Sequence, residues 1–230
     1  MEKQTEQQQA MLANMIEKAE SFVQQQLEHD HSGHDWFHID RVRKLALEIA
    51  AREGADLFIC ELAALLHDVA DEKLNDSKQA GLDKVEQWLC LHVSDPHVVT
   101  HVKAIIATMS YNGGKNPPME TLEGQVVQDA DRLDALGAIG IARTFMYAGS
   151  KGSIMHHPDK DFSQYEYRAA GKSAIYHFYE KLLKLKDLMN TAYAKEMAVI
   201  RHQWMEMYLE QFYKEWNVDD IKRKGDDSTA

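Results

Sequence analysis

The stretch that decides the fold is residues 57–70, which read LFICELAALLHDVA. Asp56 precedes it as a typical helix N-cap, and the run up to residue 66 contains one polar residue, Glu61. A helix that is apolar nearly all round is covered by neighbours on every side, so this segment predicts the buried centre of the fold. It is followed by His67 and Asp68, two polar residues where an apolar face is expected.

Helical patterns continue on both sides of this centre. They predict helices at about 5–27, 35–53, 56–66, 82–91, 95–109, 120–146, 172–190 and 191–216. The longest contains Gly137 and Gly140, whose missing side chains predict close helix packing. Residues 149–167 show the least pattern and predict a mobile surface loop, and residues 217–230 predict a frayed tail. Because no segment alternates with period two for long enough to be a strand, we expect one all-α domain over residues 1–230, with its pocket between central helices.

Composition excludes several classes of protein. The 230-residue chain is 44% hydrophobic and 27% charged, which suits a globular core and excludes intrinsic disorder. Its 37 acidic and 26 basic residues give a formal net charge of −11, which argues against nucleic-acid polymers and anionic membranes as partners. A small anionic substrate is still compatible with this charge, because a bound metal and a few bases can reverse the field within one cleft.

Neither membrane insertion nor secretion is predicted. The longest apolar stretch, Leu57–Leu66, is about half the length of a membrane span. The first ten residues, MEKQTEQQQA, lack the apolar core of a signal peptide. Cys60 and Cys90 lie inside apolar helical patterns, so we interpret them as small buried hydrophobes. We therefore expect a cytoplasmic protein, and the sequence leaves a homo-oligomer open.

Two further polar residues lie on apolar helix faces. His38 falls within roughly 40° of the centre of an apolar stripe, and Asp129 lies in the apolar stripe of the helix predicted at 120–146. A buried carboxylate without a partner is too costly to retain, so we expect a compensating cation. Together with His67 and Asp68, these residues offer two imidazoles and two carboxylates, which suit a divalent ion of the Mn, Fe, Co, Ni or Zn type.

Each of these residues also has a purely structural interpretation. A lone His38 is commonly a hydrogen-bonded core histidine, and Asp129 could be the buried partner of Arg41 or Arg132. The adjacent pair His67-Asp68 could cap a neighbouring helix. The occurrence of all four together favours a metal site over separate explanations.

Three motifs resemble those of the HD-domain phosphohydrolase superfamily, whose ligand order is H…HD…D. They are HDWFHIDRV at 34–42, LLHDV at 65–69 and QDADRLDA at 128–135. Two more stretches, GAIGIARTF at 137–145 and HFYEKLL at 177–183, resemble the small stand-alone bacterial branch. The resemblance implies a helical fold and hydrolysis of phosphate esters or anhydrides. It also implies a divalent metal, Mn or Mg first and Fe, Co, Ni or Zn as alternatives, held by His38, His67, Asp68 and Asp129.

The resemblance implies further residues around the metal. Asp71 lies about one turn beyond the His-Asp pair, where some HD nucleotidases place a carboxylate that positions the attacking water. Arg41, Lys73 and Arg132 are candidates for binding phosphate, and His34 is a candidate for bordering the metal pocket. The alternatives are a solvated charge for Asp71, surface ion pairs for the three bases, and a polar loop for His34.

Two departures from the family pattern concern the surroundings of the metal. Some HD enzymes hold a second metal with additional histidines, for which His97 and His101 are the candidates here; the alternative is a pair of ordinary histidines flanking an apolar stripe. Some close relatives carry His before a Ser-aromatic pair, whereas Met109 precedes Ser110-Tyr111 in this chain. The substrate contacts at that point are therefore left open.

The function that the resemblance implies is metal-dependent hydrolysis of a small phosphorylated substrate, with a nucleotide as the expected class. We expect cleavage of nucleoside triphosphates to monophosphate and pyrophosphate, with Asp68 and Asp71 in catalytic roles. The alternatives are a nucleoside monophosphatase of the same family and a non-catalytic regulator that binds metal and nucleotide.

Overall fold

The computed structural model describes residues 2–28, 35–71, 74–114, 116–158 and 173–219, and over these residues the chain is all-α as predicted. The one β feature there is an isolated bridge between Ile154 and Ser173. The helices are α1 (Glu2–Leu27), α2 (Trp36–Glu53), α3 (Leu57–Leu66), η1 (His67–Ala70), α4 (Lys78–His92), α5 (Pro96–Thr108), η2 (Asn112–Gly114), α6 (Leu122–Asp134), α7 (Gly137–Ser150), α8 (Ala174–His177), the π-helical η4 (Phe178–Leu182), α9 (Leu183–Leu185), η5 (Lys186–Leu188) and α10 (Ala192–Trp216).

Helix α3 is the buried centre that its composition predicts. It packs against α1, α2, α5 and α6, and its residues 62–66 are fully buried. Asp56 caps it by accepting a hydrogen bond from the backbone N–H of Ile59 at 3.0 Å. Each large apolar side chain buried there contributes about 1.5–3 kcal/mol relative to exposure. The end of α3 is therefore a rigid position for the polar residues that follow it.

The chain does not form the single long helix predicted at 120–146, so that prediction is wrong. Helix α6 ends at Asp134 and α7 begins at Gly137, which has a φ of +70°. The glycines do mark close packing: a Cβ on Gly137 would lie 3.2 Å from Arg201, and one on Gly140 would lie 2.2 Å from the carbonyl oxygen of Ala135. The turn between α6 and α7 redirects the chain so that α7 runs beside α10.

The segment after α7 differs in detail from its prediction. Helix α7 continues to Ser150, and the next residues make the bridge from Ile154 to Ser173. His156 packs between the rings of Phe212, Tyr213 and Trp216 at the end of α10. Residues 159–167 of the predicted loop and the end of the tail lie outside the described residues, and the mobility of the loop stays a prediction.

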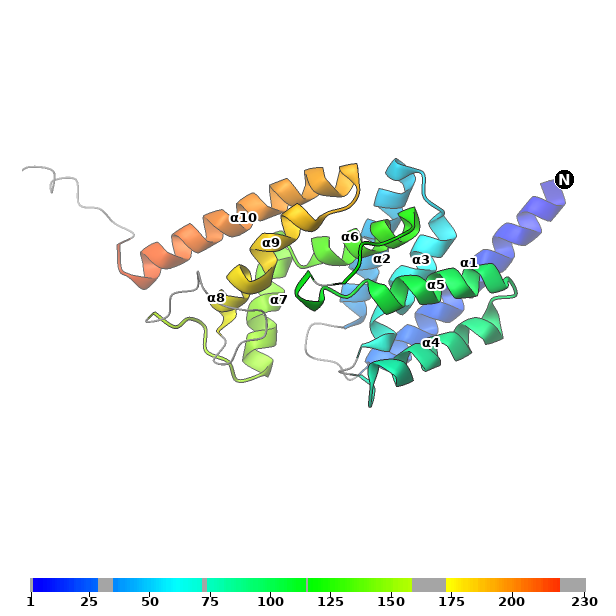
Figure 1. The fold of residues 1–230 in the computed structure, drawn as a ribbon, viewed down its shortest axis with the longest axis horizontal. Coiled ribbons are helices and arrows are strands. Elements are labelled where there is room, and N and C mark those ends of the chain that lie inside the picture. Colours follow the sequence, from blue (N-terminus) through cyan, green and yellow to red (C-terminus); the bar gives the residue numbers. More distant parts are fainter. Residues whose placement is uncertain (1, 29–34, 72–73, 115, 159–172, 220–230) are drawn as a thin grey trace, which may run out of the picture.

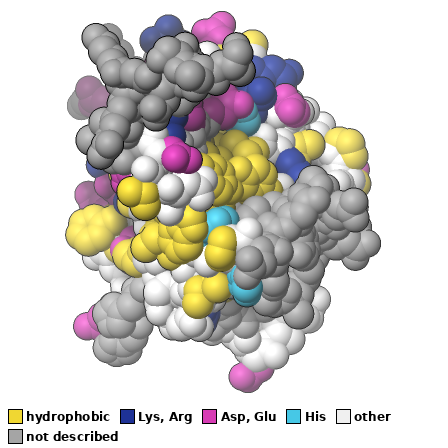
Figure 2. Space-filling view, turned by 90° about the vertical axis from the view of Figure 1, so that its left-hand side faces the viewer, with side chains coloured by type: hydrophobic (Ala, Val, Ile, Leu, Met, Phe, Trp, Pro, Cys, Tyr) yellow, Lys and Arg dark blue, Asp and Glu magenta, His cyan; other side chains and the backbone are white. Residues whose placement is uncertain are grey.

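The helices fall into two groups along the long axis of the molecule (Figure 1). Helices α1–α6 form one group, and α7–α10 form the other, with α10 along its outer side. Figure 2 views the second group end-on and shows apolar side chains gathered beside histidines on that face. Within the part of the chain that the structure describes, no helix has the length and apolar character needed to span a bilayer.

The two cysteines differ in environment, which corrects the expectation that both are buried. Cys60 lies in the α3 core, where burial raises the pKa of its thiol to about 12. Cys90 is exposed, because α4 turns Val85 and Leu89 inward and Cys90 follows on the outer side.

Candidate functional site

His38 is held in the first turn of α2 by two contacts. The carboxylate of Asp35 caps the helix by accepting a hydrogen bond from the backbone N–H of His38 at 2.9 Å. The ring is 1% exposed, and its Nδ1 lies 2.7 Å from Oδ2 of Asp134. A carboxylate at Nδ1 fixes the ring orientation and directs Nε2 the other way. There Nε2 lies 3.3 Å from Oδ2 of Asp68.

Asp134 is the carboxylate that organises this side of the site. Arg41 donates to it from Nε at 2.6 Å and from Nη2 at 3.1 Å, and Arg143 donates from Nη1 at 2.7 Å. Burial alone would raise the pKa of Asp134, but the hydrogen bonds from His38 and Arg41 outweigh burial and hold it well below its ordinary value. Asp134 is therefore an ionised anchor for three side chains.

His67 is fixed by the backbone at the end of α3. Its Nδ1 lies 2.7 Å from the carbonyl oxygen of Ala64, so the ring donates there and directs Nε2 into the site. Nε2 is buried, has no hydrogen-bond partner within the described ranges, and lies 3.3 Å from Oδ1 of Asp68. The rings of His38 and His67 meet edge to face with centroids 5.4 Å apart.

The two histidines converge on carboxylate oxygens. One ligand atom from each of His38, His67 and Asp68 lies within 4.8 Å of the others. Asp131 on α6 adds a fourth group, because its Oδ1 is 3.6 Å from Nε2 of His38 and 3.9 Å from Nε2 of His67. Asp131 thus lies close to both histidines, beside the group formed by His38, His67 and Asp68.

The environment of His38 shows that this point favours positive charge. Burial opposes protonation of the ring, but hydrogen bonds to Asp134 and Asp68 outweigh it and raise the pKa of His38 to about 9. A divalent ion would replace such a proton and would also use the orphaned Nε2 of His67. In both rings Nδ1 lies beside a hydrogen-bond acceptor. Histidines that bind metals commonly have such an acceptor, because it fixes the ring so that Nε2 can face the ion. The residues present therefore fit a divalent metal.

Asp129, a ligand in the set that the family resemblance implies, is not brought into this cluster. It is fully buried, and its carboxylate accepts hydrogen bonds of 2.8–3.0 Å from the backbone and side chains of Asn190 and Thr191. Burial raises the pKa of Asp129, although those hydrogen bonds oppose the rise. Two residues along a helix are about 200° apart, so Asp129 and Asp131 lie on opposite faces of α6. Asp129 ties α6 to the start of α10.

A cavity of about 700 Å³ opens beside the cluster. It lies between the two groups of helices, and its lining includes His67, Asp68, Asp71, Asp131 and Arg132 from the first group. Asp71 follows the end of η1, and its backbone N–H donates to the carbonyl oxygen of Asp68 at 3.0 Å. Asp71 therefore lines the same cavity as His67, Asp68 and Asp131.

The predicted phosphate-binding residues differ in their position relative to the cavity. Arg132 lines the cavity, with Nη1 donating to the carbonyl oxygen of Leu188. Arg41 is not part of the lining, and its guanidinium is paired with Asp134. His34 and Lys73 lie outside the described residues.

The candidates for a second metal site lie apart from this cavity. His101 is 2.8 Å from the hydroxyl of Thr121 and 3.7 Å from a carboxylate oxygen of Glu123. His97 is exposed at the start of α5. Among the described residues, neither histidine belongs to the cavity lining or to the group of side chains that could hold a metal.

Sequence reasoning missed Asp131, Asp134 and Arg143 as site residues. A signal for the first two was present in the motif DADRLDA at 129–135, because Asp131 and Asp134 are three residues apart and so share one helix face. Arg143 lies in the stretch at 137–145 that resembles the bacterial branch, but its contact with Asp134 depends on the turn between α6 and α7.

Comparison with known families matches this region. A model of the HD domain matches residues 36–136, which include His38, His67, Asp68 and Asp131. Bacillus subtilis YpgQ, a protein described as uncharacterized, is 42% identical over 201 residues, covering 86% of this chain and 92% of YpgQ.

Solved structures show the same similarity over nearly the whole chain. An HD-superfamily hydrolase from Bacillus thuringiensis has 51% identity and a TM-score of 0.71, covering 90% of this chain and 98% of its own. A protein from Lactobacillus plantarum has 40% identity and a TM-score of 0.79, with the same coverage. YpgQ in complex with ADP has 42% identity and a TM-score of 0.69, covering 87% of this chain and 97% of YpgQ.

Proposed function

This chain belongs to the HD-domain superfamily of hydrolases, with small bacterial homologues such as YpgQ, and we propose that it is a metal-dependent phosphohydrolase that acts on nucleotides. The observation that carries the proposal is the His38–His67–Asp68 cluster beside a cavity of about 700 Å³. A cavity of that size accommodates a whole small-molecule ligand. The ADP complex of the 42%-identical YpgQ supports a nucleotide as that ligand.

The proposed metal ligands are His38, His67, Asp68 and Asp131, with Asp131 in the place first given to Asp129. The distances from Asp131 to both histidines support this exchange, as do the hydrogen bonds that occupy Asp129. Imidazole and carboxylate ligands together suit first-row transition-metal ions, so of the two expected ions Mn²⁺ fits this set better than Mg²⁺, which prefers oxygen ligands.

The chain's own residues supply the remaining parts of a hydrolytic site. A divalent ion held there supplies Lewis acidity and lowers the pKa of a bound water. In the proposed reaction Asp71 orients the attacking water and accepts its proton, because it lines the cavity three residues after Asp68. Arg132, also in the lining, binds phosphate oxygens and offsets the charge that develops on them.

The proposed substrate is a nucleoside triphosphate. The water oxygen forms a bond to the α-phosphorus, the bond from that phosphorus to the bridging oxygen breaks, and pyrophosphate leaves with its electron pair. The proton of the water passes to Asp71 and then to solvent. The products are a nucleoside monophosphate and pyrophosphate.

A panel of nucleoside mono-, di- and triphosphates, assayed with Mn²⁺ and with Mg²⁺, tests this function. We expect metal-dependent turnover of triphosphates, with monophosphate and pyrophosphate as products and no activity in EDTA. Release of inorganic phosphate from monophosphates would instead identify a monophosphatase. Nucleotide binding without turnover of any substrate would identify a regulator.

Two alanine variants on opposite faces of α6 test the ligand assignment. Asp131→Ala should lower metal affinity more than about 100-fold. The reason is that mutating a residue that only supports a metal ligand already lowers metal affinity 10–100-fold. Asp129→Ala should keep metal affinity and lower the free energy of unfolding by about 3 kcal/mol or more, because it leaves buried donors of Asn190 and Thr191 without an acceptor. Metal titration and thermal unfolding of the same preparations measure both effects.

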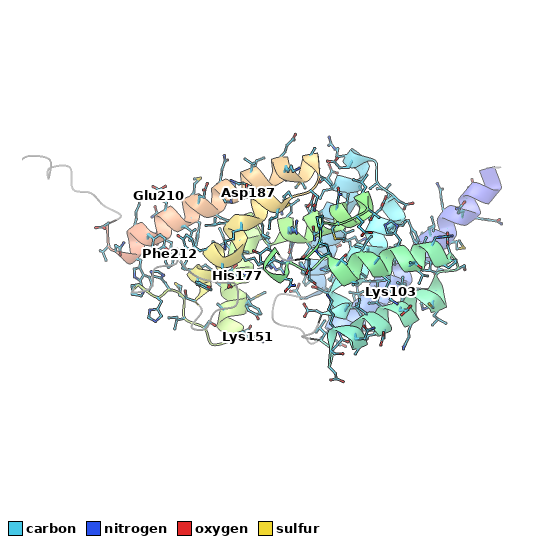
Figure 3. The ribbon with its side chains drawn as sticks, viewed as in Figure 1. Lys103, Lys151, His177, Asp187, Glu210 and Phe212 are labelled. Carbon is cyan, nitrogen blue, oxygen red and sulfur yellow. The ribbon has the colours of Figure 1, made fainter. Side chains whose placement is uncertain are left out.

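The matched control is Asp187→Ala, which removes an exposed aspartate on η5 (Figure 3). It should change neither metal affinity nor stability. Loss of metal in a stably folded Asp129→Ala variant would restore Asp129 as the ligand and remove Asp131 from the set.

A further inference from the structure

The loop that follows α5 lines the cavity beside the metal cluster. Its first four residues, MSYN from Met109 onward, all belong to the lining. The carbonyl oxygen of Met109 accepts a hydrogen bond of 3.1 Å from Nε2 of Gln128 on α6. On the other side, the centre of the Tyr111 ring lies 5.4 Å from Nζ of Lys181 on η4. The loop is therefore anchored to the helix that carries Asp131 and reaches the second group of helices.

Asn116 holds this loop and fixes the orientation of two amides. Its Nδ2 donates to the carbonyl oxygens of Thr108 at 3.1 Å and Ser110 at 2.6 Å. Because carbonyl oxygens only accept hydrogen bonds, the atom that faces them is the amide nitrogen, and Oδ1 of Asn116 points the other way as an acceptor. Nδ2 of Asn112 donates to that Oδ1 at 3.0 Å. The orientation of the Asn112 amide therefore follows from two backbone carbonyls.

The side chain of Asn112 has hydrogen-bonding capacity left over. An asparagine amide offers two N–H donors on Nδ2 and two lone pairs on Oδ1. One donor is used by Asn116, and within the described ranges the side chain makes no other hydrogen bond. Asn112 is exposed and belongs to the cavity lining. It therefore offers one oriented donor and one oriented acceptor to a ligand.

Backbone conformation alone does not account for an asparagine at this position. Asn112 has a φ of +40°, in the left-handed region that asparagine tolerates better than most side chains. Glycine adopts this region more readily still, and the chain uses glycine at the next two positions, where φ is +67° at Gly113 and +75° at Gly114. An amide at the first of three left-handed positions therefore favours a role for the side chain itself.

The chemistry of the amide indicates which part of a nucleotide it would bind. A neutral group with one donor and one acceptor suits the edge of a base, where an amino group and a ring nitrogen lie side by side; asparagine pairs with adenine in this way. Ionised phosphate oxygens only accept hydrogen bonds, so they would leave Oδ1 of Asn112 without a partner. The phosphates belong at the metal, and the amide belongs at the base.

We propose that Asn112, oriented by Asn116, hydrogen-bonds the base of the substrate, with Oδ1 accepting from an exocyclic amino group and Nδ2 donating to the adjacent ring nitrogen. The proposal rests on the proposed function. It narrows the substrate class to nucleotides with an amino-substituted base, of which adenine is the example, and sets these apart from sugar phosphates that lack a base.

The test compares two ligands on the Mn²⁺-loaded protein by calorimetry. One is α,β-methylene-ADP, whose bridge resists hydrolysis, and the other is ribose 5-(α,β-methylene)diphosphate, the same molecule without its base. In the Asn112→Gly variant, affinity for α,β-methylene-ADP should fall about tenfold, as expected for the loss of one or two neutral hydrogen bonds. Affinity for the base-free ligand should change less than about twofold. Equal losses for both ligands, or no loss for either, would overturn the proposal.

The contact is also tested from the side of the ligand. The α,β-methylene diphosphate of purine riboside lacks the amino group of adenine. It should bind the wild-type protein several-fold more weakly than α,β-methylene-ADP, and Asn112→Gly should bind the two with similar affinity, because the two changes remove the same contact. Additive losses would show that the amino group and Asn112 do not meet, and would overturn the proposal.

Glycine is the substitution of choice because it adopts the φ of Asn112 without strain. Thermal unfolding of the variant should therefore change little. A fall in stability with equal losses for both ligands would assign Asn112 to the loop alone and contradict the proposal. The matched control is Asn217→Gly at the exposed end of α10, outside the cavity lining, which should leave all affinities unchanged.

These measurements need no turnover, so the inference and the proposed function fail separately. Protein that prefers α,β-methylene-ADP through Asn112 but hydrolyses no nucleotide would contradict the function alone. Turnover of triphosphates with an unchanged preference for the base in Asn112→Gly would contradict the inference alone. Absence of both nucleotide binding and turnover would contradict both.

Discussion

Replacing Asp68 by alanine is expected to abolish both metal binding and nucleotide turnover while the helical fold is kept. The carboxylate of Asp68 lies 3.3 Å from Nε2 of His38 and 3.3 Å from Nε2 of His67. Loss of a residue that only supports a metal ligand costs 10–100-fold, so loss of a direct ligand should lower kcat/KM by more than about 1,000-fold.

The fold should survive because the helical core does not depend on this carboxylate. Asp68 follows α3, whose apolar residues make the packing contacts. The measurements are elemental analysis, steady-state kinetics and far-UV circular dichroism on one preparation, with Asp187→Ala as the control. Wild-type metal content or turnover in Asp68→Ala would remove Asp68 from the ligand set.

Asp71→Asn is expected to lower kcat by about 10²–10⁴-fold, the range that general acid–base catalysis supplies. Asparagine keeps the size of the side chain but cannot accept the proton of the attacking water. Metal content and KM should change little, because Asp71 is not among the proposed ligands. Kinetics and metal analysis of the same sample measure these quantities.

Two other outcomes for Asp71→Asn identify different roles. If Asp71 is only a solvated charge, kcat should stay unchanged and stability should shift by less than about 0.5 kcal/mol. If metal is lost together with activity, Asp71 belongs to the coordination shell. Asp68→Ala and Asp71→Asn therefore separate metal binding from proton transfer.

The central helix could be predicted because its evidence is local. An apolar run of ten residues with an N-cap before it specifies a buried helix without reference to the rest of the chain. His67 and Asp68 stand out for the same reason, since they interrupt that apolar pattern. The break between α6 and α7 was missed because Gly137 and Gly140 are compatible with a helix, and only their contacts with Arg201 and Ala135 show why the chain turns there.

The choice between Asp129 and Asp131 shows the limit of reasoning from apolar stripes. A carboxylate in a stripe is predicted to be buried, and Asp129 is. Its compensating donors come from Asn190 and Thr191, about sixty residues later in the chain, where no periodic pattern reveals them. Asp131 was not predicted because it lies on the opposite face of α6 from the apolar stripe, where it is partly exposed at the cavity edge.

Arg41 illustrates a similar limit for pairs of charges. Its position in the first motif is compatible with phosphate binding, and the sequence also allowed an ion pair. The structure pairs it with Asp134, 93 residues away, which in turn holds His38. Such a partnership depends on how α2 meets α6, and sequence periodicity carries no information on that contact.

The separation of the proposed metal ligands along the chain has a consequence for folding. His38, the His67–Asp68 pair and Asp131 come from α2, η1 and α6, so the site closes only after about ninety residues have been brought together, a closure that costs several kcal/mol of chain entropy. An ion bound there would act as a non-covalent cross-link between distant segments. Its binding energy is added to the stability of the assembled α2–α3–α6 core as a whole, since none of these helices alone offers the complete site.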